Sequence, residues 1–204
     1  MLKQFTINTN IVYKHDTFIV KQTKSLIVIS YDEKDVKKYV NTLFKELKAE
    51  DPFDQIINTV FINTQIKKSI AFEMVILRMD VNILEIFCAG NCRVIIFDDY
   101  DEKVVFTPVN ELVKIEYKEK QINLENSFLS NIKMKDSCFV FVISNIFFNH
   151  VDINDFYKFY YQNRSTKTYI QSIKEKYHHV IENNKEMILL CLEVKQCNKY
   201  KLSS

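Results

Sequence analysis

Glycine and proline are nearly absent from this chain of 204 residues, which contains one glycine and two prolines. Average glycine usage is about 7 %. A P-loop, a dinucleotide-binding fingerprint and a glycine-rich phosphate loop each require several glycines. The composition therefore excludes nucleotide binding through any of these motifs.

An excess of charge of one sign is also missing, since the formal net charge is +2. The lysines are spread along the chain, and no basic motif interleaved with aromatic residues occurs. We therefore expect neither nucleic acid nor an anionic membrane surface as a partner.

Long hydrophobic runs are absent as well. No run approaches the ~20 apolar residues that a membrane span requires, and the first residues contain no apolar signal segment. The five cysteines are an odd number, and Cys88, Cys138 and Cys191 lie inside apolar runs, which is typical of buried free thiols. We expect a reducing, cytoplasmic environment and no membrane association.

Apolar, β-branched runs and amphipathic segments nevertheless make up most of the sequence. Strands are predicted at residues 4–12, 17–20, 26–30, 69–80, 104–107, 112–117, 137–144 and 186–194. Helices are predicted at 32–47, 51–67, 152–162 and 165–183. Residues 84–97 are predicted to form a tight hairpin around Gly90, and the remainder of 110–137 is interpreted as loop.

Strands in blocks and helices in blocks predict an α+β fold, a sandwich of two mostly antiparallel sheets flanked by pairs of helices. The length fits one domain. We expect it to span residues 1–195, with a polar C-terminal tail at 196–204.

Short polar segments follow the predicted strands at several positions. Lys14-His15-Asp16 follows the first strand, Ser30-Tyr31-Asp32-Glu33 precedes the first helix, and Gly90-Asn91 lies at the centre of the predicted hairpin. Ser144-Asn145-Ile146-Phe147-Phe148-Asn149 ends the apolar strand at 137–144, and Asn184-Lys185-Glu186-Met187 precedes the last strand.

This order of elements, with these segments at the strand ends, resembles the metal-dependent protein phosphatases of the type 2C class, and their compact bacterial branch of sporulation and stress-response phosphatases in particular. The resemblance covers about residues 4–194. It implies a dinuclear site in which aspartates hold two divalent ions and a metal-bridging water attacks phosphorus.

The sequence departs from that pattern where the metal ligands are expected. Asparagine stands in place of aspartate at Asn145 and Asn184, Tyr31 stands where an Asp-Gly pair is expected, and Ile146 replaces a glycine. An asparagine amide supplies a neutral carbonyl, whereas hard cations such as Mg²⁺ need anionic oxygens. We therefore predict no catalytic residue, no metal ligand and no cofactor.

The resemblance identifies the positions of this sequence that correspond to the family's metal site, and the substitutions make that site degenerate. These positions are Asp16, Ser30, Tyr31, Asp32, Gly90, Asn91, Asn145, Ile146, Asn149 and Asn184.

Five aromatic residues crowd the predicted helix at 152–162, too densely for all to be buried. Tyr157, Tyr160 and Tyr161 are candidates for an exposed surface that contacts a protein partner. The sequence thus predicts an inactive phosphatase-like domain, a pseudophosphatase that binds or scaffolds a kinase, a phosphatase or a phosphoprotein.

Two alternatives remain open. The first is a divergent phosphatase with a reduced Mn²⁺ or Mg²⁺ site built on Asp16 and Asp32. The second is a structural subunit of a larger assembly.

Overall fold

A computed structural model describes residues 5–14, 18–23, 25–31, 34–46, 70–72, 74–89, 92–98, 104–106, 113–118, 121–124, 127–134, 137–162, 165–183 and 188–197. The elements, in chain order, are β1 (Phe5–Lys14), β2 (Phe18–Gln22), β3 (Leu26–Tyr31), α1 (Lys34–Glu46), β4 (Ile70–Phe72), β5 (Met74–Asp80), β6 (Ile83–Ala89), β7 (Cys92–Asp98), β8 (Val104–Phe106), β9 (Val113–Lys118), β10 (Gln121–Leu124), β11 (Ser127–Lys133), β12 (Cys138–Ser144), α3 (Asn145–Phe148), α4 (Ile153–Gln162), α5 (Thr166–Asn183) and β13 (Ile188–Gln196).

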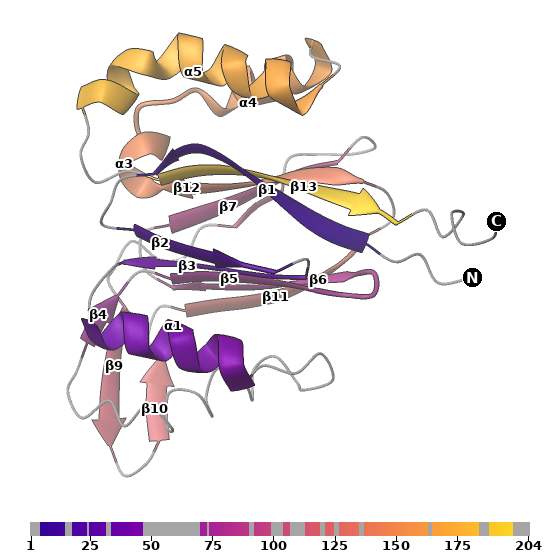
Figure 1. Cartoon of the computed structure of the whole chain (residues 1–204). Helices are drawn as coiled ribbons and strands as arrows, with labels where there is room; N and C mark the ends of the chain where they lie inside the picture. The colour runs from indigo at the N-terminus through magenta and orange to yellow at the C-terminus, as the bar shows by residue number, and fades with distance from the viewer. Residues whose placement is uncertain are drawn as a thin grey trace, which may run out of the picture.

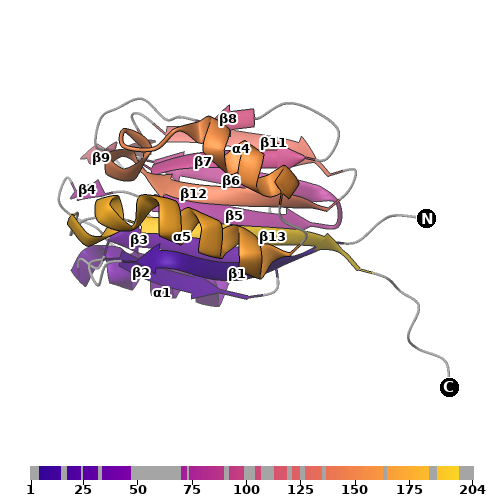
Figure 2. The same ribbon diagram turned by 90° about the horizontal axis from the view of Figure 1, so that it is seen from above.

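Three antiparallel sheets organise the described strands. Sheet A has the order β1-β13-β12-β7-β8, sheet B has the order β11-β6-β5-β3-β2, and the small sheet C has the order β10-β9-β4. Sheets A and B face each other, and α4 and α5 cover the outer face of sheet A (Figures 1 and 2). Helix α1 covers the outer face of sheet B, with sheet C beside it (Figure 1). The predicted α+β sandwich is confirmed.

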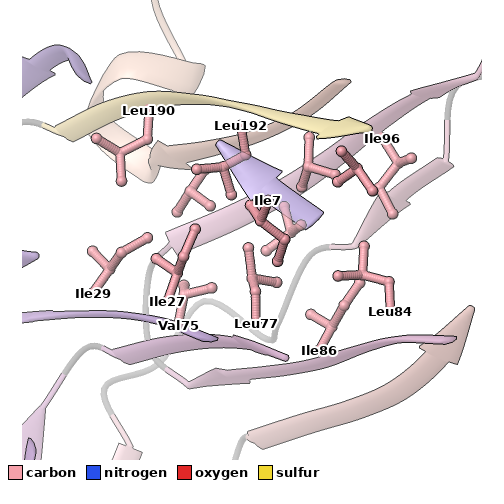
Figure 3. Packing of buried hydrophobic residues seen from close by; sticks show 14 of the residues in the cluster. Ile7, Ile27, Ile29, Val75, Leu77, Leu84, Ile86, Ile96, Leu190 and Leu192 are labelled. Atoms are coloured by element: carbon pink, nitrogen blue, oxygen red, sulfur yellow. The ribbon is translucent and has the colours of Figure 1, made fainter. Parts of the chain in front are cut away.

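Alternating side chains of the two sheets meet in the central core. Leu190 and Leu192 of β13 point toward Ile27 of β3 and Leu77 of β5 from the opposite sheet (Figure 3). Complete burial of an aliphatic side chain of this size stabilises the fold by roughly 1.5–3 kcal/mol.

A second core fills the space between sheet A and its helices. It contains Phe141 and Leu189 from the sheet, Phe147 from α3, Phe156 from α4 and Ile173 from α5. Because sheet A is covered on both faces, every residue of β13 from Ile188 to Leu192 is buried. This two-sided burial explains why these strands are apolar without alternation.

The segment 84–97 is not the predicted hairpin. Strand β6 pairs with β5 and β11 in sheet B, whereas β7 pairs with β12 and β8 in sheet A. The link around Gly90 therefore carries the chain from one sheet to the facing one. The hairpin prediction was wrong because the same local pattern fits two structures. Both a hairpin and a connection between two facing sheets have an apolar strand on each side of a short link.

The true hairpin connects β5 and β6 through the two residues Val81 and Asn82, with Asp80 opposite Ile83. The strand predicted at 69–80 is two strands, since β4 belongs to sheet C and β5 to sheet B. Strands β10 and β11 lie in the stretch interpreted as loop.

The remaining elements agree closely with the prediction, and their bounds differ by a few residues. Strand β13 ends at Gln196, the first residue of the predicted polar tail. The helix predicted at 51–67 and the tail residues 198–204 lie outside the described residues. Within the described part of the chain, no helix combines the length and apolar character that a bilayer crossing requires.

Candidate functional site

The strand ends of sheet A that carry the phosphatase-like segments lie at one edge of that sheet. Lys14, the last residue of β1, is opposite Ile188, the first residue of β13. Ser144, the last residue of β12, is opposite Cys92, the first residue of β7. Antiparallel register therefore gathers the ends of four strands at one edge.

Sheet B has an equivalent edge. Tyr31 at the end of β3 is opposite Phe18 at the start of β2, and Ser30 is opposite Met74 at the start of β5. Met74 is in turn opposite Ala89 at the end of β6.

The link between β6 and β7 joins these two edges. Ala89 ends β6 in sheet B and Cys92 begins β7 in sheet A. Three peptide units separate their Cα atoms, so the atoms lie no more than about 11 Å apart. The strand ends at Lys14, Tyr31, Ala89, Cys92, Ser144 and Ile188 therefore meet at one end of the sandwich, which we call the candidate edge.

Half of the predicted site positions flank this edge in the chain but lie outside the described residues. They are Asp16, Asp32, Gly90, Asn91 and Asn184. The structure does describe the strand ends next to each of them, and these ends come together.

The other five positions have described backbones at the candidate edge. Ser30 and Tyr31 end β3, whereas Asn145 and Ile146 form the first half of α3. Asn149 directly follows α3 and its side chain is exposed.

Buried polar contacts at the candidate edge hold the backbone in place. The Ser144 hydroxyl accepts a hydrogen bond of 3.3 Å from the backbone N–H of Ile188 and so ties β12 to β13. The Cys88 thiol lies 3.2 Å from the backbone carbonyl of Cys92 and donates to it across the sheet-to-sheet link. Both side chains have structural partners.

Arg93 adds a cation to the candidate edge. Its guanidinium stacks on the ring of Phe148, 3.8 Å from the ring centre, so that β7 contacts α3. Burial lowers the pKa of Arg93 from its ordinary value. The sequence interpretation missed this residue, although its place just after Gly90-Asn91 put it beside the expected site.

The side-chain groups described at this edge are not those that hold a dinuclear metal centre, and the carboxylates of Asp16 and Asp32 lie outside the described residues. The described groups are a hydroxyl, thiols, an amide and a guanidinium, whereas Mg²⁺ and Mn²⁺ favour several carboxylates. Among the described residues, no group of three or more His, Cys, Asp or Glu side chains is arranged to hold a metal ion. Asp80, a described carboxylate of sheet B, lies at the opposite end of β5.

The aromatic residues of α4 divide between core and surface. Tyr157 and Tyr161 are 37 % and 56 % exposed, and their hydroxyls are 3.0 Å apart. Tyr160 is half-buried, and its ring packs against Phe97 and Phe139. Tyr157 and Tyr161 are therefore exposed, whereas Tyr160 is partly a core residue. We call these three residues the tyrosine patch.

A pocket of about 390 Å³ lies beside the tyrosine patch, and sequence interpretation did not anticipate it. It is lined by Phe139, Tyr160, Ser165, Thr166, Tyr169, Glu193 and Lys195. Phe139 is five residues before Ser144 in β12, so the pocket lies about 17 Å along the strand from the candidate edge. The pocket and the candidate edge are separate features.

No protein-family profile matches the sequence, and no curated protein is detectably similar to it in sequence. Solved structures with the same fold are numerous. One is PppA, described as a key regulatory component of the type VI secretion system of Pseudomonas aeruginosa, with 10 % identity and a TM-score of 0.60 over 97 % of this chain and 99 % of that one.

Two further similar structures carry phosphatase descriptions. The PPM Ser-Thr phosphatase MsPP from Mycobacterium smegmatis has 7 % identity and a TM-score of 0.61, over 93 % of this chain and 97 % of its own. The catalytic domain of the serine/threonine phosphatase PstP, solved with two manganese ions, has 9 % identity and a TM-score of 0.59, over 96 % and 99 %. At such identities the similarity establishes the fold.

Proposed function

We propose that this chain, which has the fold of the PPM-type protein phosphatases, is a catalytically inactive phosphatase-like domain that binds a protein partner. The observation that carries the proposal is the candidate edge. The strand ends that meet there adjoin, in the sequence, the segments in which the resemblance expects acidic metal ligands, and the sequence supplies amides at Asn145 and Asn184.

The physical basis is charge. Two divalent ions bring four positive charges to one site, and several carboxylates must offset them and orient the nucleophilic water. An Asn side chain is nearly isosteric with Asp and contributes no formal charge. The substitutions therefore keep the shape of a metal site and remove much of its affinity.

The proposed activity is protein binding in a signalling context, with a kinase, an active phosphatase or a phosphoprotein as the class of partner. The exposed rings of Tyr157 and Tyr161 support this role, because large aromatic side chains on a surface are typical of protein contact sites.

A second candidate is a divergent phosphatase that uses Asp16 and Asp32 with one Mn²⁺ or Mg²⁺ ion. Both carboxylates are retained in the segments that adjoin Lys14 and Tyr31, two strand ends of the candidate edge. A third candidate function is that of a structural subunit in a larger assembly.

Calorimetric titration of the purified chain with Mn²⁺ and Mg²⁺, alongside hydrolysis of p-nitrophenyl phosphate, tests the proposal. We expect no binding below millimolar metal and no metal-dependent turnover. Asn145→Asp combined with Asn184→Asp should tighten metal binding at least tenfold, because it restores two anionic ligands.

Metal-dependent turnover that Asp16→Ala abolishes would overturn the proposal in favour of the divergent phosphatase. The matched control is Asp80→Ala, since Asp80 is an exposed carboxylate at the opposite end of sheet B. This variant should leave both measurements unchanged. A chain that self-associates in size-exclusion chromatography would support the structural reading.

A further inference from the structure

Strand β1 forms one edge of sheet A, on the side of the sandwich opposite β8 (Figure 2). Among the described strands, β13 pairs with one side of β1 and no strand pairs with its other side. A sheet edge of ten residues with unpaired backbone groups is a template for a further strand. What this edge can bind depends on which residues of β1 direct their backbone groups outward.

The neighbouring strand β13 fixes these directions. The backbone N–H groups of Ile188 and Gln196 in β13 donate to the hydroxyls of Ser144 and Ser137, on the side of β12. Because the backbone groups of successive strand residues alternate in direction, every second residue of β13 from Ile188 to Gln196 faces β12. The residues between them, including Glu193, face β1.

Three residues of β1 direct their backbone groups away from the sheet. Glu193 is opposite Asn8, so Asn8 bonds to β13. By the same alternation, the N–H and C=O groups of Ile7, Thr9 and Ile11 point outward. The first residue of β1 agrees with this pattern, because its N–H bonds to the tip of the β5–β6 hairpin and not to β13.

Two side chains of the same stretch would also gain from a further strand. The Thr9 hydroxyl oxygen is buried and has no hydrogen-bond partner in the described part of the chain, which is unfavourable for an isolated molecule. The Ile11 side chain is 51 % exposed. A strand placed along the edge would cover Ile11 and bring hydrogen-bonding groups close to Thr9.

The edge is complementary to a second copy of itself. Residues Phe5–Tyr13 carry no charged side chain, so antiparallel pairing of two β1 strands brings no like charges together. Lysine and proline, which commonly block sheet edges, are missing from this stretch. The bulge in β1 lies between Ile11 and Tyr13 and leaves Phe5–Ile11 regular.

We propose that β1 pairs antiparallel with β1 of a second copy of this chain, about a twofold axis at Thr9. In this register Thr9 is opposite the partner's Thr9, and Ile7 is opposite the partner's Ile11. Each of the three residue pairs exchanges two backbone hydrogen bonds, about six in all. Cβ atoms of directly opposite residues lie about 5 Å apart, so the two Thr9 hydroxyls come within reach of each other.

The pairing leaves the tyrosine patch accessible in both copies. Tyr157 packs against Phe97 of β7 with ring centroids 6.1 Å apart, and β13 and β12 separate β7 from β1 in sheet A. The dimer therefore carries two tyrosine patches, and a partner with two matching sites would bind it more tightly than one copy. This inference goes beyond the proposed function, which requires only one copy.

Sedimentation equilibrium of the full chain between about 5 and 500 µM tests the pairing. We expect a single monomer–dimer equilibrium with a dissociation constant in the micromolar range, as suits a small interface. A chain that stays monomeric at about 500 µM would overturn the proposal. Species larger than a dimer would also contradict it, because a twofold pair is closed.

Ile11→Lys should weaken the dimer at least about tenfold, because it places a charge where the paired strand covers an apolar side chain. The exposure of Ile11 allows this variant to fold normally. The matched control is Ile83→Lys, which changes an isoleucine that is 37 % exposed at the start of β6 in sheet B. The control should keep the dissociation constant within about twofold, and equal weakening by both variants would contradict the proposal.

Amide hydrogen exchange at about 500 µM tests the register. Relative to the Ile11→Lys variant, the N–H groups of Ile7 and Thr9 should exchange at least about threefold more slowly in the natural chain, because they are bonded only in the dimer. The N–H groups of Asn8 and Asn10 bond to β13 in both states and should change less. Equal changes at all four amides would contradict pairing through this edge.

Failure here is distinguishable from failure of the proposed function. A monomeric chain without metal-dependent turnover would refute the β1 pairing alone. A dimeric chain with metal-dependent turnover would refute inactivity and leave the pairing standing. A structural subunit differs from both, since it would add copies beyond the closed pair.

Discussion

The backbone carbonyl of Val81 accepts a hydrogen bond of 3.0 Å from the backbone N–H of Phe5, and this contact joins the tip of the β5–β6 hairpin in sheet B to the start of β1 in sheet A. The neighbouring carbonyl of Asn82 accepts a bond of 2.7 Å from the N–H of Met134, just after β11. Both turn residues thus anchor other parts of the fold, at the end of the sandwich opposite the candidate edge.

Val81 has a φ of 52°, a conformation that costs a β-branched residue roughly 1–2 kcal/mol. We expect Val81→Gly to raise the free energy of unfolding in urea by about 0.5–1 kcal/mol, after the entropic cost of glycine is subtracted. Val81→Ala, which retains the Cβ atom, is the control. If the Gly variant is no more stable than the Ala variant, the turn is not strained.

Arg78 and Glu85 are directly opposite each other on β5 and β6 and form an ion pair whose side chains are only 6 % and 13 % exposed. Glu85→Gln should lower the free energy of unfolding by about 3 kcal/mol, because it removes the carboxylate that pairs with the buried Arg78 guanidinium. The double variant Arg78→Met, Glu85→Leu should recover most of that loss.

The comparison for this pair is Lys195→Gln, which breaks the more exposed contact with Glu193 and should cost less than about 1 kcal/mol. If Glu85→Gln and Lys195→Gln lower the free energy of unfolding by equal amounts, burial does not strengthen the Arg78–Glu85 pair.

Asp155 at the start of α4 accepts hydrogen bonds from Lys176 at 2.6 Å and from the Tyr177 hydroxyl at 2.5 Å. The contact with Lys176 and then that with Tyr177 lower the pKa of Asp155 below its ordinary value, against the opposing effect of burial. A carboxyl with a lowered pKa in the folded state adds stability above its unfolded pKa of about 3.9, and this stability is lost as the pH falls through the lowered value.

Tyr177→Phe should therefore reduce the free energy of unfolding by about 1–2 kcal/mol above pH 4, with a smaller reduction at lower pH. Urea unfolding between pH 2 and pH 6 measures this. Tyr157→Phe, which removes an exposed hydroxyl contact with Tyr161, should change stability equally at every pH. A Tyr177→Phe effect that is independent of pH would contradict the assignment.

Cys191 is fully buried in the core of sheet A, and burial raises the pKa of its thiol. The thiolate is the reactive form, so iodoacetamide at pH 8 should modify half-buried Cys197 at least about tenfold faster than Cys191 in the native chain. In concentrated urea both should react at similar rates, as mass spectrometry of tryptic peptides would show. Native labelling of Cys191 at the rate of Cys197 would contradict the buried placement.

The candidate site was predictable in part. Phosphatase-like segments at strand ends identified the strands that meet at the candidate edge, because a strand end is a local feature of hydrophobic pattern. The stacking of Arg93 on Phe148 and the pocket around Tyr160 were not predictable, because each joins elements that only the packing of sheet A against its helices brings together.

The sequence by itself determined the classes of structure and the absence of glycine-rich motifs. Apolar periodicity located the helices at 152–162 and 165–183 and the buried strands at 137–144 and 186–194. This was possible because the spacing of apolar residues along a short segment depends on the type of element and on the face that it buries. One glycine excluded phosphate loops, and asparagines at Asn145 and Asn184 predict the loss of metal ligands.

Only the tertiary structure decided which strand pairs with which. Gly90 lies between two apolar runs that would be equally buried as a hairpin or as strands of facing sheets, so local pattern could not choose between them. The choice depends on long-range partners, β11 for β6 and β12 for β7. These pairings bring the strand ends of the candidate edge together.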